Sequence, residues 1–252
     1  MTQFWDGRAK TLEDQAALPI ANPVEMGQPD LEAAVASLAA IPEYEREFQE
    51  VFGRPPNGQD LVRALASYER TLTSSETPDL TNFKDDDFHN IGVLIVRHHV
   101  VPLAREAEKL VDSGNAADVD RAAIGTDMSA LGRFLVTKKE PDIASFKTPG
   151  LRNVLVTGPY FHDGSHPTLW DVLDHYNKGA SSQDPWLDQD IRPLGLQESE
   201  LNDLVAFMAS LTSDAYRAQG EQELARQRAL SRTDRPYRDT RRAFGRRPAT
   251  FH

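Results

Sequence analysis

The sequence FKTPGLRNVLVTGPYFHDG, residues 146–164, is the most distinctive stretch of this chain. Its first half, Phe146 to Asn153, contains too many turn-forming residues for a regular helix or strand. It therefore predicts a long ordered loop. The scaffold that holds this loop must come from the segments on either side.

On the N-terminal side, apolar residues recur at helical spacing over Leu31–Phe52, and Pro42 interrupts the pattern. Because proline is tolerated at the start of a helix but disrupts its interior, this stretch predicts two helices. A third helix is expected over Asn57–Leu72, with Asn57 as its N-cap. The residues before Pro29 are rich in turn formers and predict an ordered loop with one short helix.

Further helices are expected at Pro102–Val111, Thr168–Lys178 and Glu198–Leu211. Thr168 and Asp171 form a capping-box pattern at the start of the second of these helices. The third helix is expected to place its apolar residues on one face, namely Leu201, Leu204, Phe207, Met208 and Leu211. The predicted fold is therefore mainly α-helical with long ordered loops.

The 252 residues include 39 acidic and 28 basic side chains, which give a formal net charge of −11. Nucleic acid and anionic membranes should be repelled by this charge, so neither is expected as a partner. No apolar run reaches the about 18 residues that a membrane-spanning helix needs, and the first residues lack the pattern of a signal peptide. Beyond Ser213 many arginines occur among few apolar residues, which predicts a largely solvated basic tail. The alternative is an electrostatic contact of this tail with a partner or with the acidic part of the chain itself.

The chain contains no cysteine. Disulfides, thiolate catalysis, Cys-ligated zinc, iron–sulfur clusters and thioether-linked haem are therefore excluded. Histidines remain as possible metal ligands, but none of His89, His162 and His175 forms a pair at i, i+4 on a predicted helix. A histidine metal site is therefore not expected.

A dense pattern near the N-terminus comprises Trp5, Gln15, Pro19 and Glu25. In type and spacing, these positions resemble the peroxidatic-site segment of the di-haem cytochrome c peroxidase and MauG family of bacterial oxidoreductases. Residues 86–93, DDFHNIGV, resemble the stretch that follows the second haem-attachment motif of the family. Residues 146–164 resemble its most recognisable string, so the resemblance extends over most of the chain.

The resemblance implies a role for each N-terminal residue. Cleavage of peroxide needs a base that takes a proton from one oxygen and returns it to the other. Glu25 would be this acid–base, Gln15 would orient peroxide or water, Pro19 would form a packing wall, and Trp5 would relay electrons between two haems. Taken alone, the same residues also fit structural roles, as a core anchor, a turn cap or a solvated carboxylate.

Two further positions are implied to bind cofactors. Thr157 and Pro159 match the residues whose oxygens help to hold a structural calcium ion in the family, and calcium prefers oxygen ligands. Tyr176 matches the distal axial ligand of the second haem, where MauG-type members carry tyrosine and classical members carry methionine. Tyr176 therefore favours the MauG-like branch, although a helix-end tyrosine with a packed ring and a wet hydroxyl is the structural alternative.

The resemblance implies two haem c groups, but both Cys-x-x-Cys-His attachment segments are missing, and residues 81–85, TNFKD, stand where the second is expected. We therefore expect two cytochrome c-like helical domains, both incomplete at these segments. Residues 1–80 would be the remnant of the N-terminal, peroxidatic-haem domain. Residues 81–215 would form the C-terminal, electron-transfer-haem domain, and residues 216–252 the Arg-rich tail.

The function implied is that of a periplasmic di-haem peroxidase or MauG-like oxidoreductase. Its partners would be hydrogen peroxide and either a small electron-donor protein, such as a cytochrome c or a cupredoxin, or a protein substrate. The alternative is a haem-free, catalytically inactive remnant that serves as a binding or interaction module. A noncovalently held haem with Tyr176 as its ligand is a third possibility.

Overall fold

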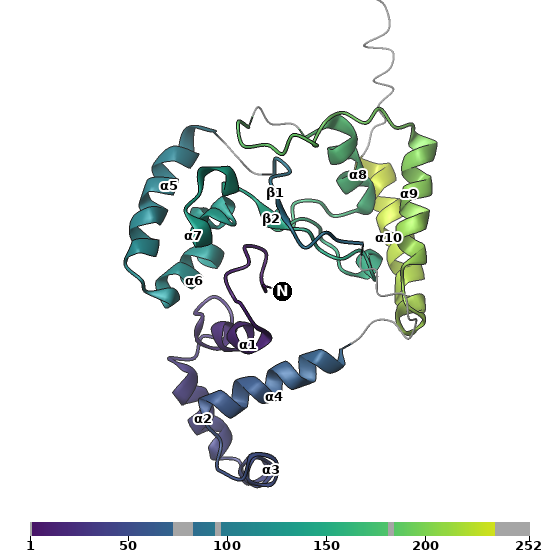
Figure 1. Cartoon of the computed structure of the whole chain (residues 1–252). Helices are drawn as coiled ribbons and strands as arrows, with labels where there is room; N and C mark the ends of the chain where they lie inside the picture. The colour runs from purple at the N-terminus through teal and green to yellow at the C-terminus, as the bar shows by residue number, and fades with distance from the viewer. Residues whose placement is uncertain (1, 73–82, 94–96, 181–183, 235–252) are drawn as a thin grey trace, which may run out of the picture. The chain divides into compact units, whose positions relative to one another are not determined.

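The computed structural model describes residues 2–72, 83–93, 97–180 and 184–234. Residues 235–252 of the predicted Arg-rich tail and residues 81–82 of the expected attachment segment lie outside these ranges. The described chain is mainly α-helical, as the sequence predicts (Figure 1). It divides into two compact units, of which unit 1 is Met1–Gly150 with Lys178–Pro193, and unit 2 is Leu151–Asn177 with Leu194–His252. The domain boundary expected at residue 80 stays a prediction.

Unit 1 begins with a helical module made of α1 (Leu12–Ala21), α2 (Leu31–Ala39), α3 (Pro42–Phe52) and α4 (Gly58–Thr71). The break at Pro42 is confirmed, because this proline is the first residue of α3. The cap at Asn57 is confirmed as well, since its Oδ1 accepts a hydrogen bond of 3.0 Å from the backbone N–H of Asp60. Ile20, Phe48 and Leu61 form the buried centre of the module.

The rest of unit 1 consists of α5 (Arg97–Asp112), α6 (Ala116–Gly125), α7 (Phe134–Thr137), the 3-10 helices Asp127–Leu131 and Glu140–Asp142, and two short strands. Strands β1 (Phe88–His89) and β2 (Phe146–Lys147) pair antiparallel, with Phe88 opposite Lys147. The strand β2 lies inside the stretch for which the sequence predicts only a loop. A strand of only two residues forms here because its hydrogen-bonding partner, β1, comes from a part of the chain that is distant in sequence.

Helix α5 begins at Arg97, although the sequence predicts a start at Pro102. Proline inside a helix removes one backbone hydrogen bond. Here Val100 and Ala104 are buried against Leu131 and Phe134, on either side of Pro102. Burial of this apolar face offsets the cost of the proline, which no local sequence signal could reveal.

Unit 2 contains α8 (Leu169–Lys178), α9 (Glu198–Ser210), α10 (Arg217–Asp234) and the 3-10 helices Val154–Val156 and Asp214–Tyr216. Its core comprises Leu155, Tyr160, Leu169, Trp170, Val205 and Met208. The capping pattern predicted before α8 is confirmed, because Thr168 Oγ1 accepts the N–H of Asp171 at 3.2 Å and the Asp171 carboxylate accepts the N–H of Thr168 at 3.1 Å.

The apolar face predicted for α9 is wrong in part. Leu201, Val205 and Met208 are buried, whereas Leu204 is 38% exposed and Phe207 is 46% exposed. Residues 201, 205 and 208 are spaced i, i+4 and i+7, so they share one face of the helix. Leu204 and Phe207 are turned away from that face.

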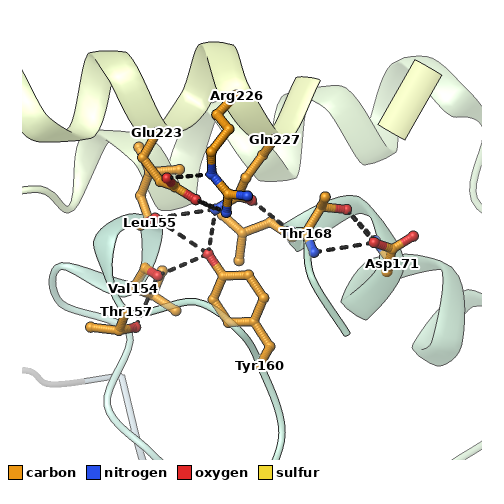
Figure 2. A network of polar contacts seen from close by, with 10 residues as sticks. Val154, Leu155, Thr157, Tyr160, Thr168, Asp171, Glu223, Arg226 and Gln227 are labelled. Atoms are coloured by element: carbon orange, nitrogen blue, oxygen red, sulfur yellow. Dashed lines mark hydrogen bonds and ion pairs between the residues drawn. The ribbon is translucent and has the colours of Figure 1, made fainter. Parts of the chain in front are cut away.

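Helix α10 occupies the first part of the segment that the sequence predicts as a largely solvated tail. Most of its described side chains are exposed, as expected, but part of the helix is buried. Gln227 of α10 is fully buried, and its Oε1 accepts the backbone N–H of Leu169 at 2.9 Å. Its amide nitrogen lies 2.8 Å from the Tyr160 hydroxyl, 3.2 Å from the Leu155 carbonyl and 2.9 Å from Glu223 (Figure 2). These contacts join α10 to the core of unit 2.

We expect Gln227→Leu to lower the free energy of unfolding by about 2–4 kcal/mol. Leucine fills a similar volume but leaves the buried N–H of Leu169 and the carbonyl of Leu155 without this partner. The measurement is urea-induced unfolding followed by circular dichroism.

Gln222→Leu is the matched control, because Gln222 is exposed on the same helix. It should change the stability by less than about 0.5 kcal/mol. Equal effects of the two substitutions would contradict a structural role for the buried amide.

Candidate functional site

The N-terminal segment holds Trp5 at the surface of unit 1. The N–H of Gln3 donates to the carbonyl of Ala9 at 2.7 Å, which closes the segment into a tight loop. The carbonyl of Trp5 accepts the N–H of Lys147 in β2 at 2.8 Å. Trp5 is 42% exposed, so this side chain is not a core anchor.

Helix α1 carries Gln15 and Pro19, which are four residues apart and therefore share one face. It begins at a capping box between Thr11 and Asp14. The helix ends in a turn whose backbone folds back on it, because the carbonyl of Pro19 accepts the N–H of Met26 at 3.1 Å.

Glu25 belongs to the turn that follows α1. The carbonyl of Asn22 accepts the N–H of Glu25 at 3.1 Å and the N–H of Gly27 at 2.9 Å, while Asn22 Oδ1 accepts the N–H of Val24 at 3.0 Å. Asn22 is therefore the residue that shapes this turn. The structure thus brings Gln15, Pro19 and Glu25 together on one helix and its closing turn.

A buried charge network connects this turn to the Trp5 segment. Arg8 Nε donates to Asp120 Oδ1 at 2.9 Å, and Arg8 Nη1 donates to Asp6 Oδ1 at 3.1 Å. Asn22 Nδ2 donates to the other oxygen of Asp120 at 2.7 Å. The Arg8 side chain is 10% exposed, and Asp6, Asn22 and Asp120 are buried. The network therefore joins α6, the turn after α1 and the residue next to Trp5.

Electrostatics change the proton affinity of two carboxyl groups at this site. The carboxyl of Glu25 is exposed, and its pKa is raised above the usual value by partial desolvation and by the negative charge of Asp120, against the opposing charge of Arg8. Burial also raises the pKa of Asp6, and Arg8 opposes that shift. Glu25 therefore holds its proton up to a higher pH than an ordinary glutamate does.

The backbone of Trp5 is bonded to β2, whereas the backbone of Glu25 is bonded to Asn22 in the turn after α1. Asp6, Arg8 and Asp120 provide the connection between them, and the sequence analysis did not single out these three residues. Asp6 and Arg8 could have been found, because they directly follow Trp5 in the same motif. Asp120 gives no such signal, since it is far from the motif in sequence.

Tyr176 lies in α8 of unit 2 within a group of rings. Its ring centroid is 6.1 Å from that of Phe161 and 5.7 Å from that of His175, and His175 is 5.5 Å from His166. Burial raises the pKa of the Tyr176 phenol, which favours the neutral hydroxyl over phenolate. Tyr176 is thus a half-buried, packed residue in this structure.

Thr157 and Pro159 are exposed in the loop between the 3-10 helix Val154–Val156 and α8. The hydroxyl of Thr157 donates to the carbonyl of Val154 at 3.0 Å. Among the residues that the structure describes, no group of three or more His, Cys, Asp or Glu side chains is placed to hold a metal ion.

His89 makes ion pairs rather than a metal site. Its Nδ1 lies 2.7 Å from Asp188 Oδ2, and its Nε2 lies 3.0 Å from Asp85 Oδ2. Both carboxylates stabilise the imidazolium and raise the pKa of His89, although partial burial opposes the shift. His89 thus joins β1 to the segment that contains Asp188.

Comparisons with known proteins identify the family to which the chain belongs. A family model described as di-haem cytochrome c peroxidase matches residues 1–86. The chain is 34% identical to the methylamine utilization protein MauG of Methylorubrum extorquens, over 83% of this chain and 60% of the relative. It is 32% identical to the cytochrome c peroxidase Ccp of Escherichia coli, over 83% of this chain and 44% of the relative. The chain therefore spans only part of the length of these relatives.

A MauG of Paracoccus denitrificans is 31% identical over 90% of this chain and 71% of its own length. The crystal structure of a MauG-like protein associated with microbial copper homeostasis superposes with a TM-score of 0.62, at 21% identity, over 84% of this chain and 72% of that one. The fold and the relatives together define a peroxidase-like class of helical oxidoreductases. Within this class, the chain belongs to the di-haem cytochrome c peroxidase and MauG family.

Membership of this family implies haem c as the cofactor. The residues of this chain, however, cannot form the covalent bonds that attach haem c. Thioether bonds to haem c require cysteine thiols, and the chain has none. The helices that the structure describes also include none that is long and apolar enough to cross a membrane.

We expect Asp120→Asn to lower the pKa of Glu25. The substitution removes the negative charge that raises this pKa and leaves the positive charge of Arg8 less compensated. It should also destabilise the fold by roughly 3 kcal/mol, because a buried ion pair loses one partner. Carbon-13 NMR titration of the Glu25 carboxyl and urea unfolding are the two measurements.

Asp118→Asn, on the same helix, is the control, since Asp118 bonds to Asn115 and Arg121 and takes no part in the network. It should leave the titration of Glu25 unchanged. An unchanged or higher pKa of Glu25 in Asp120→Asn would refute the coupling.

A second prediction concerns His89 and pH. Because the pKa of His89 is raised in the folded state, its stabilisation is fully present below the ordinary histidine pKa of about 6.5 and is lost as pH rises through the folded-state value. The difference in Tm between the wild type and His89→Gln should therefore shrink between pH 6 and pH 8.5, measured by thermal unfolding.

His162 serves as a contrast, since burial lowers its pKa. The stabilisation that His162 provides should be lost as pH falls. The Tm difference between the wild type and His162→Gln should therefore grow, not shrink, between pH 6 and pH 8.5. The role assigned to the His89 ion pairs is wrong if the Tm difference for His89→Gln is constant across this range.

Proposed function

We propose that this chain supplies the peroxide-handling residues of a peroxidase-type oxidoreductase. Glu25 would act as the acid–base that moves a proton between the two oxygens of hydrogen peroxide. Gln15 would orient peroxide or water, Pro19 would form the wall of the pocket, and Trp5 would relay electrons. The substrate would be hydrogen peroxide.

One observation carries this proposal: Gln15, Pro19 and Glu25 share one helix and its closing turn, and the buried Asn22–Asp120 bond holds that turn. The raised pKa of Glu25 supports the acid–base role, because a group that both takes and returns a proton works best with a pKa near the working pH. The exposure of Trp5 suits a residue that exchanges electrons with a neighbouring group.

The other components of the proposed system come from the family. Electrons would arrive from a cytochrome c or a cupredoxin, or would be taken from a protein substrate, in the periplasm. Tyr176 would be one of the residues that hold a haem bound without thioether bonds. Thr157 and Pro159 would contribute to a calcium site, which needs further oxygen ligands because calcium takes six to eight.

A second candidate is a haem-free binding module, and the absence of cysteine favours it. The alignment with the Paracoccus denitrificans relative is also consistent with lost segments. It runs over 301 positions although it covers only 90% of the 252 residues here, so that relative contains residues with no counterpart in this chain.

One experiment separates the two candidates. The protein is purified from haem-replete cells, and its absorption spectrum and its consumption of hydrogen peroxide with a reduced small cytochrome c are measured. The peroxidase proposal predicts a Soret band and peroxide consumption. Glu25→Gln should slow that consumption by about 100-fold or more while the band is kept.

Glu45→Gln, an exposed glutamate of α3, is the control and should leave the rate unchanged. A wild-type protein with neither a Soret band nor peroxide consumption would refute the peroxidase proposal and favour the haem-free module. A normal rate in Glu25→Gln would remove Glu25 from the acid–base role.

A further inference from the structure

The chain between α8 and α9 includes a segment that belongs to unit 1, and we call residues 184–193 the strap. The base of this loop is narrow, because a Cβ atom on Gly179 would come within 2.4 Å of the backbone nitrogen of Pro193. Gly179 and Ala180 have positive φ values of 73° and 60° directly after the end of α8. Hinges are found at residues of this kind, at the ends of secondary-structure elements. The strap is therefore part of a loop with a base at which it can turn.

Contacts with β1 and the residue after it hold the strap in place. The N–H of Asp188 donates to the carbonyl of Asn90 at 2.9 Å, and Asp188 Oδ2 lies 2.7 Å from His89 Nδ1. Asn90 is buried, and its Nδ2 donates to Asp184 Oδ2 at 2.8 Å. Trp186 packs against the buried apolar cluster of unit 1. Histidine is the side chain whose charge ordinarily changes near neutral pH, so the contact of His89 is the one of these that pH can alter.

His89 serves two carboxylates at once, because its Nε2 lies 3.0 Å from Asp85 Oδ2 while its Nδ1 faces Asp188. An imidazolium donates from both ring nitrogens, whereas a neutral imidazole has one N–H. Loss of the proton therefore leaves one of the two carboxylates facing a nitrogen lone pair. It also removes the positive charge that both carboxylates share, and hydrogen bonds between charged groups are the stronger ones.

The two carboxylates differ in how they are held beside His89. Asp85 belongs to the segment before β1, and its Oδ1 accepts the N–H of Asp87 at 3.0 Å. Asp188 comes from the strap and can leave with it. Phe146 of β2, which carries no charge, is opposite His89 in the sheet. The raised pKa of His89 agrees with this arrangement, because both carboxylates favour its charged form.

We propose that the strap is a pH-sensitive device, held against β1 while His89 is protonated and opening locally about its base when His89 loses its proton. Deprotonation removes the shared positive charge, and Asp188 then moves away from the ring nitrogen and from Asp85. Opening exposes Trp186 and the side chain of Asn90. The strap takes no part in the proposed proton transfer to peroxide, so this proposal does not rest on the peroxidase function.

Amide hydrogen exchange at residue 188, followed by NMR between pH 6 and pH 9 and corrected for the intrinsic exchange rate, tests the proposal. In the wild type the opening constant should rise by about tenfold over this range, since each unit by which pairing raises a pKa corresponds to a factor of ten. The constant should not change in urea up to about 1 M, because local opening exposes little surface. The buried Leu135, whose N–H donates to the carbonyl of Gly132 at 3.1 Å, reports global unfolding and should show a smaller opening constant that rises with urea.

His89→Gln and Asp188→Asn should each abolish the rise with pH. Circular dichroism shows whether each variant is folded, and either one suffices for the test. Asp190→Asn is the matched control and should keep the rise, because Asp190 is exposed on the same strap. The proposal fails if the wild-type opening constant at residue 188 is independent of pH, if it has the urea dependence of Leu135, or if a folded His89→Gln variant keeps the tenfold rise.

Discussion

The N-terminal half of unit 1 depends on one buried cation. Arg8 lies between Asp6 and Asp120, and Asn22 completes the network from the end of α1. A buried guanidinium is tolerated only where carboxylates compensate its charge, so the segments that carry these residues must come together. The Phe4 ring covers the guanidinium, whose carbon lies 3.7 Å from the ring centroid, and Arg8 Nη2 is buried without a hydrogen-bond partner among the described residues.

This network also shapes the candidate site. Asp120 holds the turn of Glu25 through Asn22, and its charge raises the proton affinity of Glu25. The interaction that stabilises the fold therefore also raises the pKa of Glu25, the residue proposed for proton transfer. The turn that carries Glu25 is thus held by hydrogen bonds and ion pairs of this chain's own residues, and the chain has no cysteine for covalent haem attachment.

Short sequence patterns correctly predicted the helix starts that depend only on neighbouring residues. Pro42 and Asn57 mark helix starts, and Thr168 precedes α8, because caps and prolines act within one turn of the chain. Helices α6 and α10 were not predicted, and the predicted start of α5 was wrong. Burial of Val100 decides the start of α5 and the bonds of Gln227 decide the position of α10, and both involve residues distant in sequence.

The sequence by itself determined the family, through the spacing of Trp5, Gln15, Pro19 and Glu25, and it determined that no thioether bond can form. Only the tertiary structure decided which side chains that are distant in sequence come close together. Asp120 reaches Arg8, and Asp188 reaches His89, only after the chain has folded. Coulomb interactions depend on distance in space, and separation along the chain does not specify that distance.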